Sequence, residues 1–319
     1  MSLSSSYLLY GLCIRSDVAL TAPSAPDSAA PDLTVLLGER LPGNATPPDG
    51  EVWAKADFGN GFGVQLTKTD LGWSLFYPQT GEFRLTEDLR SATAHPLPGR
   101  DGILSLLLAG SVPSWVLNLR GEPVLHASAV AVGDDALAFI GASGMGKTTL
   151  AALLCSVGAR MVTDDVLRLT PRNDQFLCHH GTGELRLREG AASLAERFSA
   201  APSARSADQR VTVQLSANQT SLPRLRALVI PQPSRTLTEL SVQRLSAVEA
   251  SFYLNGYARV YGWQRDEPLR RQFELFTALA GKLPVLRAHI PWGPPFAPGL
   301  PQQLAVACGL SWPCLHAPK

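Results

Sequence analysis

Hydrophobic and polar positions divide the chain into two parts. Before about residue 120, short runs rich in aromatic and β-branched side chains alternate with turns that contain Gly, Asn or Pro. These runs are residues 52–58, 62–67, 73–77 and 82–85. An apolar segment, 103–119, follows; it falls short of the roughly 20 apolar residues that a membrane span needs and contains Pro113. We therefore expect residues 1–119 to form a small β-rich domain that ends in a buried, helical segment.

After residue 120 the pattern changes to strand, loop, helix and strand. In order, it predicts a strand at 136–140, a helix at 148–157, strands at 160–163 and 226–230, the latter closed by Pro231, and helices at 242–254 and 269–283. The Ala/Ser-rich stretch 191–207 is expected to be a mobile flap. Alternation of strands and helices predicts an α/β fold for residues 120–319.

A glycine-rich loop joins the first of these strands to the first helix. It consists of Gly141, Ala142, Ser143, Gly144, Met145, Gly146, Lys147 and Thr148, followed by Thr149. This fits G-x-x-x-x-G-K-[ST], in which glycines let successive backbone N–H groups turn inward around a phosphate. The lysine can reach the terminal phosphates of a nucleotide and the threonine hydroxyl can bind Mg²⁺. A glycine turn without a ligand is the alternative, but the flanking strand and helix favour a nucleotide site.

Two adjacent carboxylates, Asp164 and Asp165, follow the strand at 160–163. In a parallel α/β sheet, this end of the strand faces the ligand crevice on the side of the phosphate loop. Neighbouring side chains on an extended backbone point to opposite faces, so we expect the two carboxylates to differ in role. One can bind Mg²⁺ and the other can take the proton of an attacking hydroxyl. A cap or turn is the structural alternative.

Histidines offer weaker candidates. His126 begins an apolar strand, where a lone histidine is more often part of the core, although it could also tune a neighbouring carboxylate. His179 and His180 lie beside Cys178 but lack a second pair of ligands, so no metal site is expected there.

Composition and charge bear on the partners and the compartment of the protein. The net charge of +1 gives no reason to expect nucleic acid or an anionic membrane as partner. The five cysteines are widely spaced and contain no C-x-x-C pair, which is typical of reduced thiols in the cytoplasm. No basic residue precedes the apolar run at 7–14, so a secretory signal is not expected.

Together, the run Leu125–Val130, the glycine loop and the run Gly158–Asp165 resemble the catalytic domain of HPr serine kinase/phosphorylase. They resemble even more closely the HPr-kinase-like proteins found with ribosomally made peptides, including kinases of lasso-peptide precursors. The likeness is strongest over residues 120–170 and weaker to about residue 235. It implies a P-loop kinase domain related in fold to phosphoenolpyruvate carboxykinase, which transfers the γ-phosphoryl group of ATP, with Mg²⁺, to a serine of a small protein or peptide.

The resemblance also implies roles for residues. Asp164 would be the base and Asp165 would lie near the metal, while His126 would contact the acidic pair and Lys147 and Thr148 would keep their phosphate-loop roles. Glu184 would be a further acidic metal ligand. A homo-oligomer is compatible with the family.

The sequence also departs from the family. The glycine-rich signature that HPr kinase/phosphorylases carry downstream is absent, so HPr and reverse phosphorolysis are not implied. Where the kinase-like proteins often show a Lys-Arg pair, the chain has Gln209 and Arg210. Three alternatives stay open: a nucleotide-dependent regulator or NTPase, a nucleotide-binding scaffold without activity, and a kinase of a small molecule.

Overall fold

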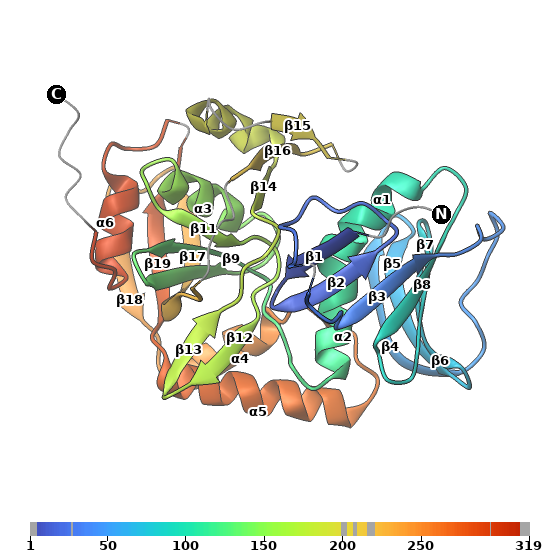
Figure 1. The fold of residues 1–319 in the computed structure, drawn as a ribbon. Helices are drawn as coiled ribbons and strands as arrows, with labels where there is room; N and C mark the ends of the chain where they lie inside the picture. The colour runs from blue at the N-terminus through green and yellow to red at the C-terminus, as the bar shows by residue number, and fades with distance from the viewer. Residues whose placement is uncertain are drawn as a thin grey trace. The chain divides into compact units, whose positions relative to one another are not determined.

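The structure is a computed structural model that describes residues 5–26, 28–198, 203–206, 209–215, 221–293 and 295–312 (Figure 1). It is a mixed α/β protein with several sheets. The chain divides into two compact units. Unit 1 comprises the described residues up to Val124 together with Gln209 and Ala258–Glu274, and unit 2 comprises those in Leu125–Ser206, Arg210–Tyr257 and from Leu275 onward.

Unit 1 is built on one eight-stranded sheet. Its strands are β1 (Ser5–Leu9), β2 (Leu12–Ser16), β3 (Leu33–Leu37), β4 (Glu51–Gly59), β5 (Phe62–Thr69), β6 (Gly72–Tyr77), β7 (Gly81–Leu85) and β8 (Ser91–Pro96). Their spatial order is β1-β2-β3-β8-β7-β6-β5-β4, in which β3 runs parallel to both neighbours and the other pairs are antiparallel. Strands β4 to β7 coincide with the four runs that the sequence predicts.

The apolar segment after this sheet is helical. It consists of α1 (Asp101–Leu106), a π-helical turn (Leu107–Ser111) and α2 (Val112–Leu119). By length and composition it could cross a membrane, but 56% of its most apolar stretch is buried inside the protein. The Tyr77 hydroxyl, from β6, lies 2.8 Å from that of Ser111 in the helical segment. This burial is typical of a core helix, as the sequence predicts.

A later segment, Ala258–Glu274, returns to unit 1. Trp263 forms a bridge with Ala54 of β4, and its ring lies 5.2 Å from that of Trp115 in an edge-on arrangement. The boundaries predicted from sequence, 1–119 and 120–319, do not anticipate this return, because it depends on contacts between residues far apart in the chain. Helix α5 (Asp266–Lys282) consequently has residues in both units.

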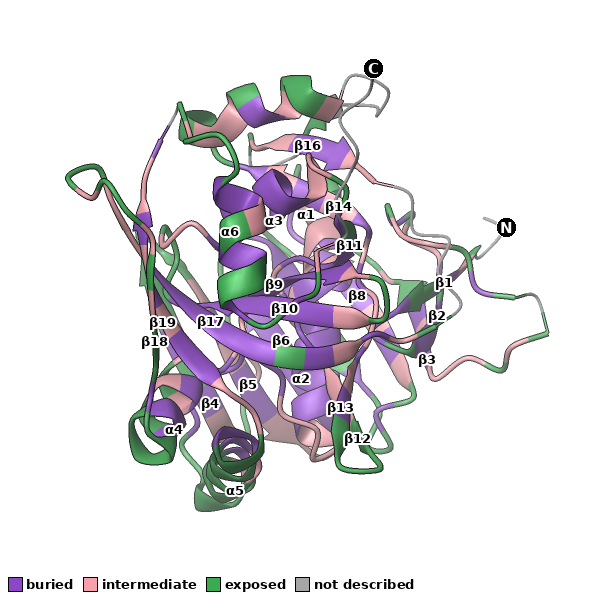
Figure 2. Ribbon diagram, turned by 90° about the vertical axis from the view of Figure 1, so that its left-hand side faces the viewer, coloured by how far each residue is buried: buried purple, intermediate pink, exposed green. Residues whose placement is uncertain are grey.

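Unit 2 contains the second large sheet. Its strands are β9 (Ala127–Val132), β10 (Asp135–Ile140), β11 (Arg160–Thr163), β12 (Leu169–Arg172), β13 (Gln175–Cys178), β17 (Arg224–Ser234), β18 (Ser241–Arg244) and β19 (Val285–Pro291). The order is β11-β9-β10-β17-β13-β12, with β19 beside β17 and β18 beside β19. Figure 2 shows β9, β10 and β17 largely buried.

Strand β9 runs antiparallel to both β10 and β11. Ala127 therefore pairs with Ile140 at the end of β10, and Ala129 pairs with Thr163 at the end of β11. The sheet is thus mixed, whereas the sequence argument assumed parallel strands. The antiparallel insertion brings the start of β9 beside the carboxyl ends of the two strands that carry the loop and the acidic pair.

Besides the end of α5, from Leu275 onward, unit 2 contains other helices and a small sheet. They are α3 (Lys147–Cys155), the 3₁₀ helix η2 (Glu189–Phe198), α4 (Ala247–Gly256), α6 (Leu300–Ala307), and a sheet of β14 (Glu184–Leu187), β15 (Ser203–Arg205) and β16 (Val211–Gln214). Leu150 and Leu153 of α3 pack with Phe139 of β10 and Leu304 of α6 in one buried cluster. Each such buried side chain stabilises the fold by about 1.5–3 kcal/mol relative to exposure, so α3 is held firmly against the sheet.

Three boundaries differ from the sequence predictions. The helix predicted at 242–254 begins only at Ala247, because Ser246 and Glu249 form a capping box and the residues before it pair with β19. Strand β17 continues through Pro231, since beyond Val229 its pairing is with β19 and no longer with β10, and proline is tolerated where a strand is paired on one side. The predicted flap 191–207 contains part of η2 and β15, and residues 199–202 and 207 lie outside the described residues.

Candidate active site

The glycine loop connects the buried end of β10 to the first turn of α3. Gly146 caps the helix with a left-handed backbone, φ +85°, which glycine adopts without strain. A Cβ at this position would lie 2.4 Å from Cη2 of Trp292, so the close approach of the indole also requires glycine. The first N–H groups of α3 have no partner within their helix, and with the helix dipole they favour an anion at this end.

Lys147 is buried and its ammonium group is held inside the loop. Its Nζ donates to the carbonyl oxygens of Gly141 and Ala142 at 2.8 and 3.1 Å. The N–H of Ala142 in turn donates to the thioether of Met145 at 3.0 Å. A full positive charge therefore lies at the loop, beside the positive end of α3, where terminal phosphates of a nucleotide would be stabilised.

Asp164 lies at the end of β11 in a buried, polar contact set. Its Oδ1 accepts hydrogen bonds from Ser128 at 2.5 Å and from Thr148 at 2.9 Å. Its Oδ2 accepts the N–H of Arg186 at 3.4 Å. Burial raises the pKa of Asp164 above its ordinary value, and the nearby Asp165 raises it further, while the bonds from Ser128 and Thr148 oppose the rise. The carboxylate is thus tied directly to the loop threonine.

Asp165 has different surroundings. Its Oδ1 lies 3.4 Å from Nε2 of His126, and each side chain is about one-third exposed, at 33% and 32%. Its backbone has φ +76°, so the expectation of two carboxylates on an extended strand is wrong. The chain turns directly after β11, where the Thr163 hydroxyl donates to the carbonyl of Val166 at 2.5 Å. Both carboxylates line the same cavity, with Asp164 buried and Asp165 partly exposed.

The phosphate loop, the acidic pair, His126 and Ser128 line one cavity of about 280 Å³, which we call the loop cavity. Its lining also includes four arginines and two aromatic residues: Arg186, Arg188, Arg210, Arg235, Trp292 and Phe296. The Arg188 guanidinium donates to the Ser143 hydroxyl of the loop at 2.6 Å. Guanidinium groups around a lysine and a helix N-terminus are suited to a polyanion.

Several of these residues were not identified from sequence. Ser128 lies two positions after His126, so the two side chains point to the same side of the extended chain. This spacing could have identified Ser128 as a site residue. Arg186 in β14 and Arg188 directly after this strand follow the same alternation, but nothing in the sequence placed β14 beside the loop. Glu184, predicted as a metal ligand, does not line the loop cavity, and that prediction stays untested.

The donors present fit a magnesium ion bound with a nucleotide. Mg²⁺ takes oxygen ligands, often one or two from the protein with the remainder from phosphates and water. Thr148 and Asp164 offer a hydroxyl and a carboxylate in contact with each other beside the loop. Within the described ranges no group of three or more His, Cys, Asp or Glu side chains could hold a metal by itself. The hydroxyl and carboxylate of this pair suit a metal whose remaining ligands are phosphates and water.

His179 and His180, the two adjacent histidines, hydrogen-bond to groups outside the loop cavity. The Nε2 atom of His179 lies 2.7 Å from the Thr170 hydroxyl, and that of His180 lies 3.0 Å from the carbonyl oxygen of Ser221. Burial, with smaller contributions from Arg168 and His180, lowers the pKa of His179 to about 4. The imidazole of His179 is therefore neutral near pH 7.

The raised pKa of Asp164 leads to a prediction about stability. A carboxyl whose pKa is higher in the folded than in the unfolded state favours folding at low pH, and this contribution is lost as pH rises through the folded pKa. Without Mg²⁺ and nucleotide, Asp164→Asn should therefore raise the Tm at about pH 7 by a few degrees, with a smaller gain near the ordinary Asp pKa of about 3.9. Thermal melts over this pH range measure the difference. Asp165→Asn, at a partly exposed position, is the matched control; equal gains in both variants would contradict the argument.

Comparison with known proteins gives one weak structural likeness. No protein-family model matches the chain, and no curated protein matches it. Among solved structures, the HPr(Ser) kinase/phosphatase from Coxiella burnetii is similar with a TM-score of 0.30 and 11% identity, over 57% of this chain and 86% of that one. A likeness at this level says nothing about activity, which must be argued from the site.

Proposed function

We propose that the protein is an ATP- and Mg²⁺-dependent kinase that transfers the γ-phosphoryl group to a serine hydroxyl of a small protein or peptide. The observation that carries the proposal is the 2.9 Å contact between the hydroxyl of Thr148 and the carboxylate of Asp164. It joins a phosphate loop to an acidic strand end in one cavity, together with a second, more exposed carboxylate. Phosphoryl transfer needs these parts: a phosphate cradle, oxygen ligands for the metal, and a base.

Contacts favour a division of roles between the carboxylates. Asp164 is buried against Thr148, the position of a metal ligand, so we assign it to Mg²⁺. Asp165 is accessible and pairs with His126, which suits the base that meets an incoming hydroxyl. The family resemblance alone assigned the base to Asp164, and the two assignments make opposite predictions for substitution.

The reaction then follows from the residues. The serine oxygen attacks the γ-phosphorus, a new O–P bond forms, and the bond to the β-phosphate oxygen breaks to leave ADP. Asp165 takes the serine proton, and His126 beside it orients the carboxylate and, when protonated, stabilises its charge. Lys147 binds the terminal phosphates, while the arginines around the loop offset the charge that spreads over the phosphoryl oxygens. Mg²⁺, when bound, would neutralise the β- and γ-phosphates.

The test is a transfer assay with γ-labelled ATP, Mg²⁺ and a library of serine peptides beside matched alanine peptides. Label should enter serine peptides only, and the phosphate should be mapped to that serine by mass spectrometry. ATP hydrolysis that no hydroxyl acceptor stimulates would favour an NTPase or regulator instead. ATP binding without any turnover would indicate a scaffold, and label on a small alcohol but on no peptide would indicate a small-molecule kinase.

A further inference from the structure

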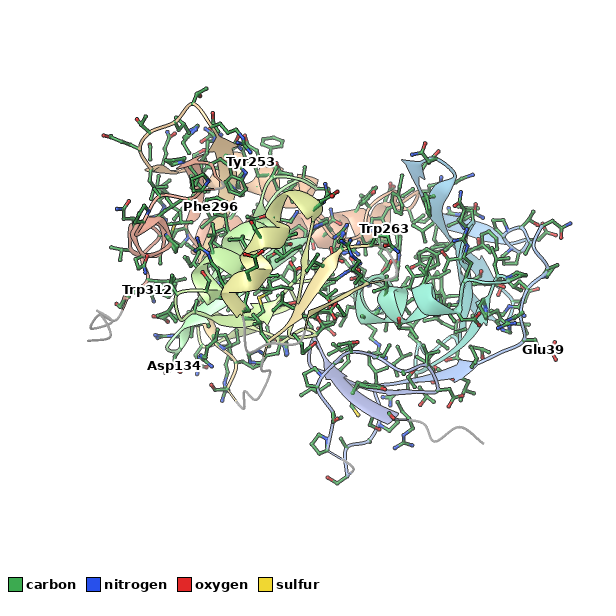
Figure 3. All side chains as sticks on the ribbon, turned by 90° about the horizontal axis from the view of Figure 1, so that it is seen from above. Glu39, Asp134, Tyr253, Trp263, Phe296 and Trp312 are labelled. Atoms are coloured by element: carbon green, nitrogen blue, oxygen red, sulfur yellow. The ribbon has the colours of Figure 1, made fainter. Side chains whose placement is uncertain are left out.

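Two aromatic side chains of the loop cavity have no part in the proposed phosphoryl transfer. Trp292 directly follows β19. Phe296, labelled in Figure 3, comes shortly after it in the chain. Their rings meet edge to face, with centroids 5.2 Å apart and an interplanar angle of 88°. Apart from the imidazole of His126, they are the aromatic rings among the described residues that line this cavity.

The backbone holds Trp292 against the phosphate loop. Its N–H donates to the carbonyl of Ser234, at the end of β17, at 3.0 Å. Directly after Trp292, Gly293 and Pro295 approach each other closely, since a Cβ on Gly293 would lie 2.5 Å from the backbone of Pro295. At the other end of the side chain, the six-membered ring of the indole contacts Gly146, immediately before Lys147. The indole is therefore a fixed wall of the cavity.

Trp292 and Phe296 are both only half-buried, although they pack on the core beneath them. A large aromatic surface left partly open in a cavity otherwise lined by small, polar and charged groups, apart from the buried Leu187, is suited to a flat, apolar ring. When phosphates occupy a loop of this kind, the rest of the nucleotide has to extend along an adjoining wall. The wall that touches Gly146 is the one made by Trp292.

We infer that Trp292, supported by Phe296, forms the nucleobase site, where the base of a nucleoside triphosphate stacks on the indole with a preference for purines. The inference rests on the proposed function. It assigns a site to the base of the nucleotide, whereas the loop binds the phosphates. Purines present a larger π-face than pyrimidines, and stacking of this kind discriminates by area more than by hydrogen bonds. The acceptor side of the cavity is placed instead at Asp165 and His126.

Calorimetry with two probes tests this: Mg²⁺-ATP, and Mg²⁺-tripolyphosphate, which has the phosphates without a base. Trp292→Ala should weaken ATP binding about 10-fold, as expected for loss of one stacked base, and leave tripolyphosphate binding within about twofold. Trp292→Phe should recover most of the affinity. The preference of the wild type for ATP over UTP should shrink in Trp292→Ala. Phe252→Ala, which removes an aromatic that is 73% exposed on α4, is the matched control and should change neither probe.

The outcomes separate this inference from the proposed function. If the wild type binds neither probe, the proposed function fails and this inference fails with it. If the wild type binds both probes and Trp292→Ala alters neither, the nucleobase site alone is wrong. Unchanged ATP binding with a raised KM for a serine peptide in Trp292→Ala would also overturn it, because the aromatic wall would then belong to the acceptor. Unaltered tripolyphosphate binding in the variant shows that the loop has kept its structure.

Discussion

The Asp165→Asn variant is expected to transfer phosphate about 1,000-fold more slowly than the wild type, within the range typical of a lost general base. The amide cannot take the serine proton, but it has nearly the same size and keeps an oxygen toward His126, whose Nε2 lies 3.4 Å from the carboxylate in the wild type. The affinity for Mg²⁺-ATP should change by no more than about twofold, since the carboxylate that we assign to Mg²⁺, in contact with the loop threonine, is that of Asp164. Single-turnover transfer to a serine peptide and equilibrium binding measure the two effects.

Asp164→Asn is the comparison for this variant. Asp164 accepts the hydroxyl of Thr148, so its carboxylate is the one that we assign to Mg²⁺. Its replacement should therefore raise the Mg²⁺ concentration needed for transfer, and added Mg²⁺ should recover part of the activity. Raised Mg²⁺ should give no recovery in Asp165→Asn. The opposite pattern, with recovery only in Asp165→Asn, would return the base to Asp164 as the family resemblance assigns it.

Lys147→Met is expected to weaken ATP binding about 100-fold, as for loss of a charge-assisted contact worth about 1.5–3 kcal/mol. The buried ammonium group is held by two loop carbonyls, and methionine keeps the length of the side chain without its charge. Binding is measured by calorimetry with Mg²⁺-ATP, and transfer is measured in the peptide assay.

Lys282→Met is the control for this change. It removes an exposed lysine of α5 whose ammonium lies 3.7 Å from Asp174, outside the loop cavity. An equal loss of ATP affinity in both lysine variants would show that general charge, and not the loop lysine, attracts the nucleotide.

Local patterns predicted much of the site. The glycine loop, the helix after it and the acidic pair lie close together in sequence, and each has a spacing that local backbone physics dictates. The strand that follows α3 returns to the same sheet, which brings Asp164 to the loop. His126 was a weaker prediction, because a histidine at the start of an apolar strand has the same sequence pattern whether it belongs to the core or to a site.

The other features of the site depend on the tertiary structure and could not be predicted from the sequence. The antiparallel direction of β9 brings Ser128 beside Asp164, and no local pattern sets the direction of a strand within a mixed sheet. Trp292 lies more than a hundred residues after the loop and reaches Gly146 only because β19 pairs with β17. The left-handed backbone at Asp165 was also missed, since aspartate adopts it only where the surrounding turn requires it.

Titration of ATP into the protein with and without Mg²⁺ tests the central claim, that the loop cavity binds a nucleoside triphosphate together with its metal. We expect saturable binding at one site in the presence of Mg²⁺, weaker binding when Mg²⁺ is removed, and loss of most of the affinity in Lys147→Met. The absence of any binding heat with ATP and Mg²⁺ at several temperatures, in a protein shown to be folded, would contradict the claim.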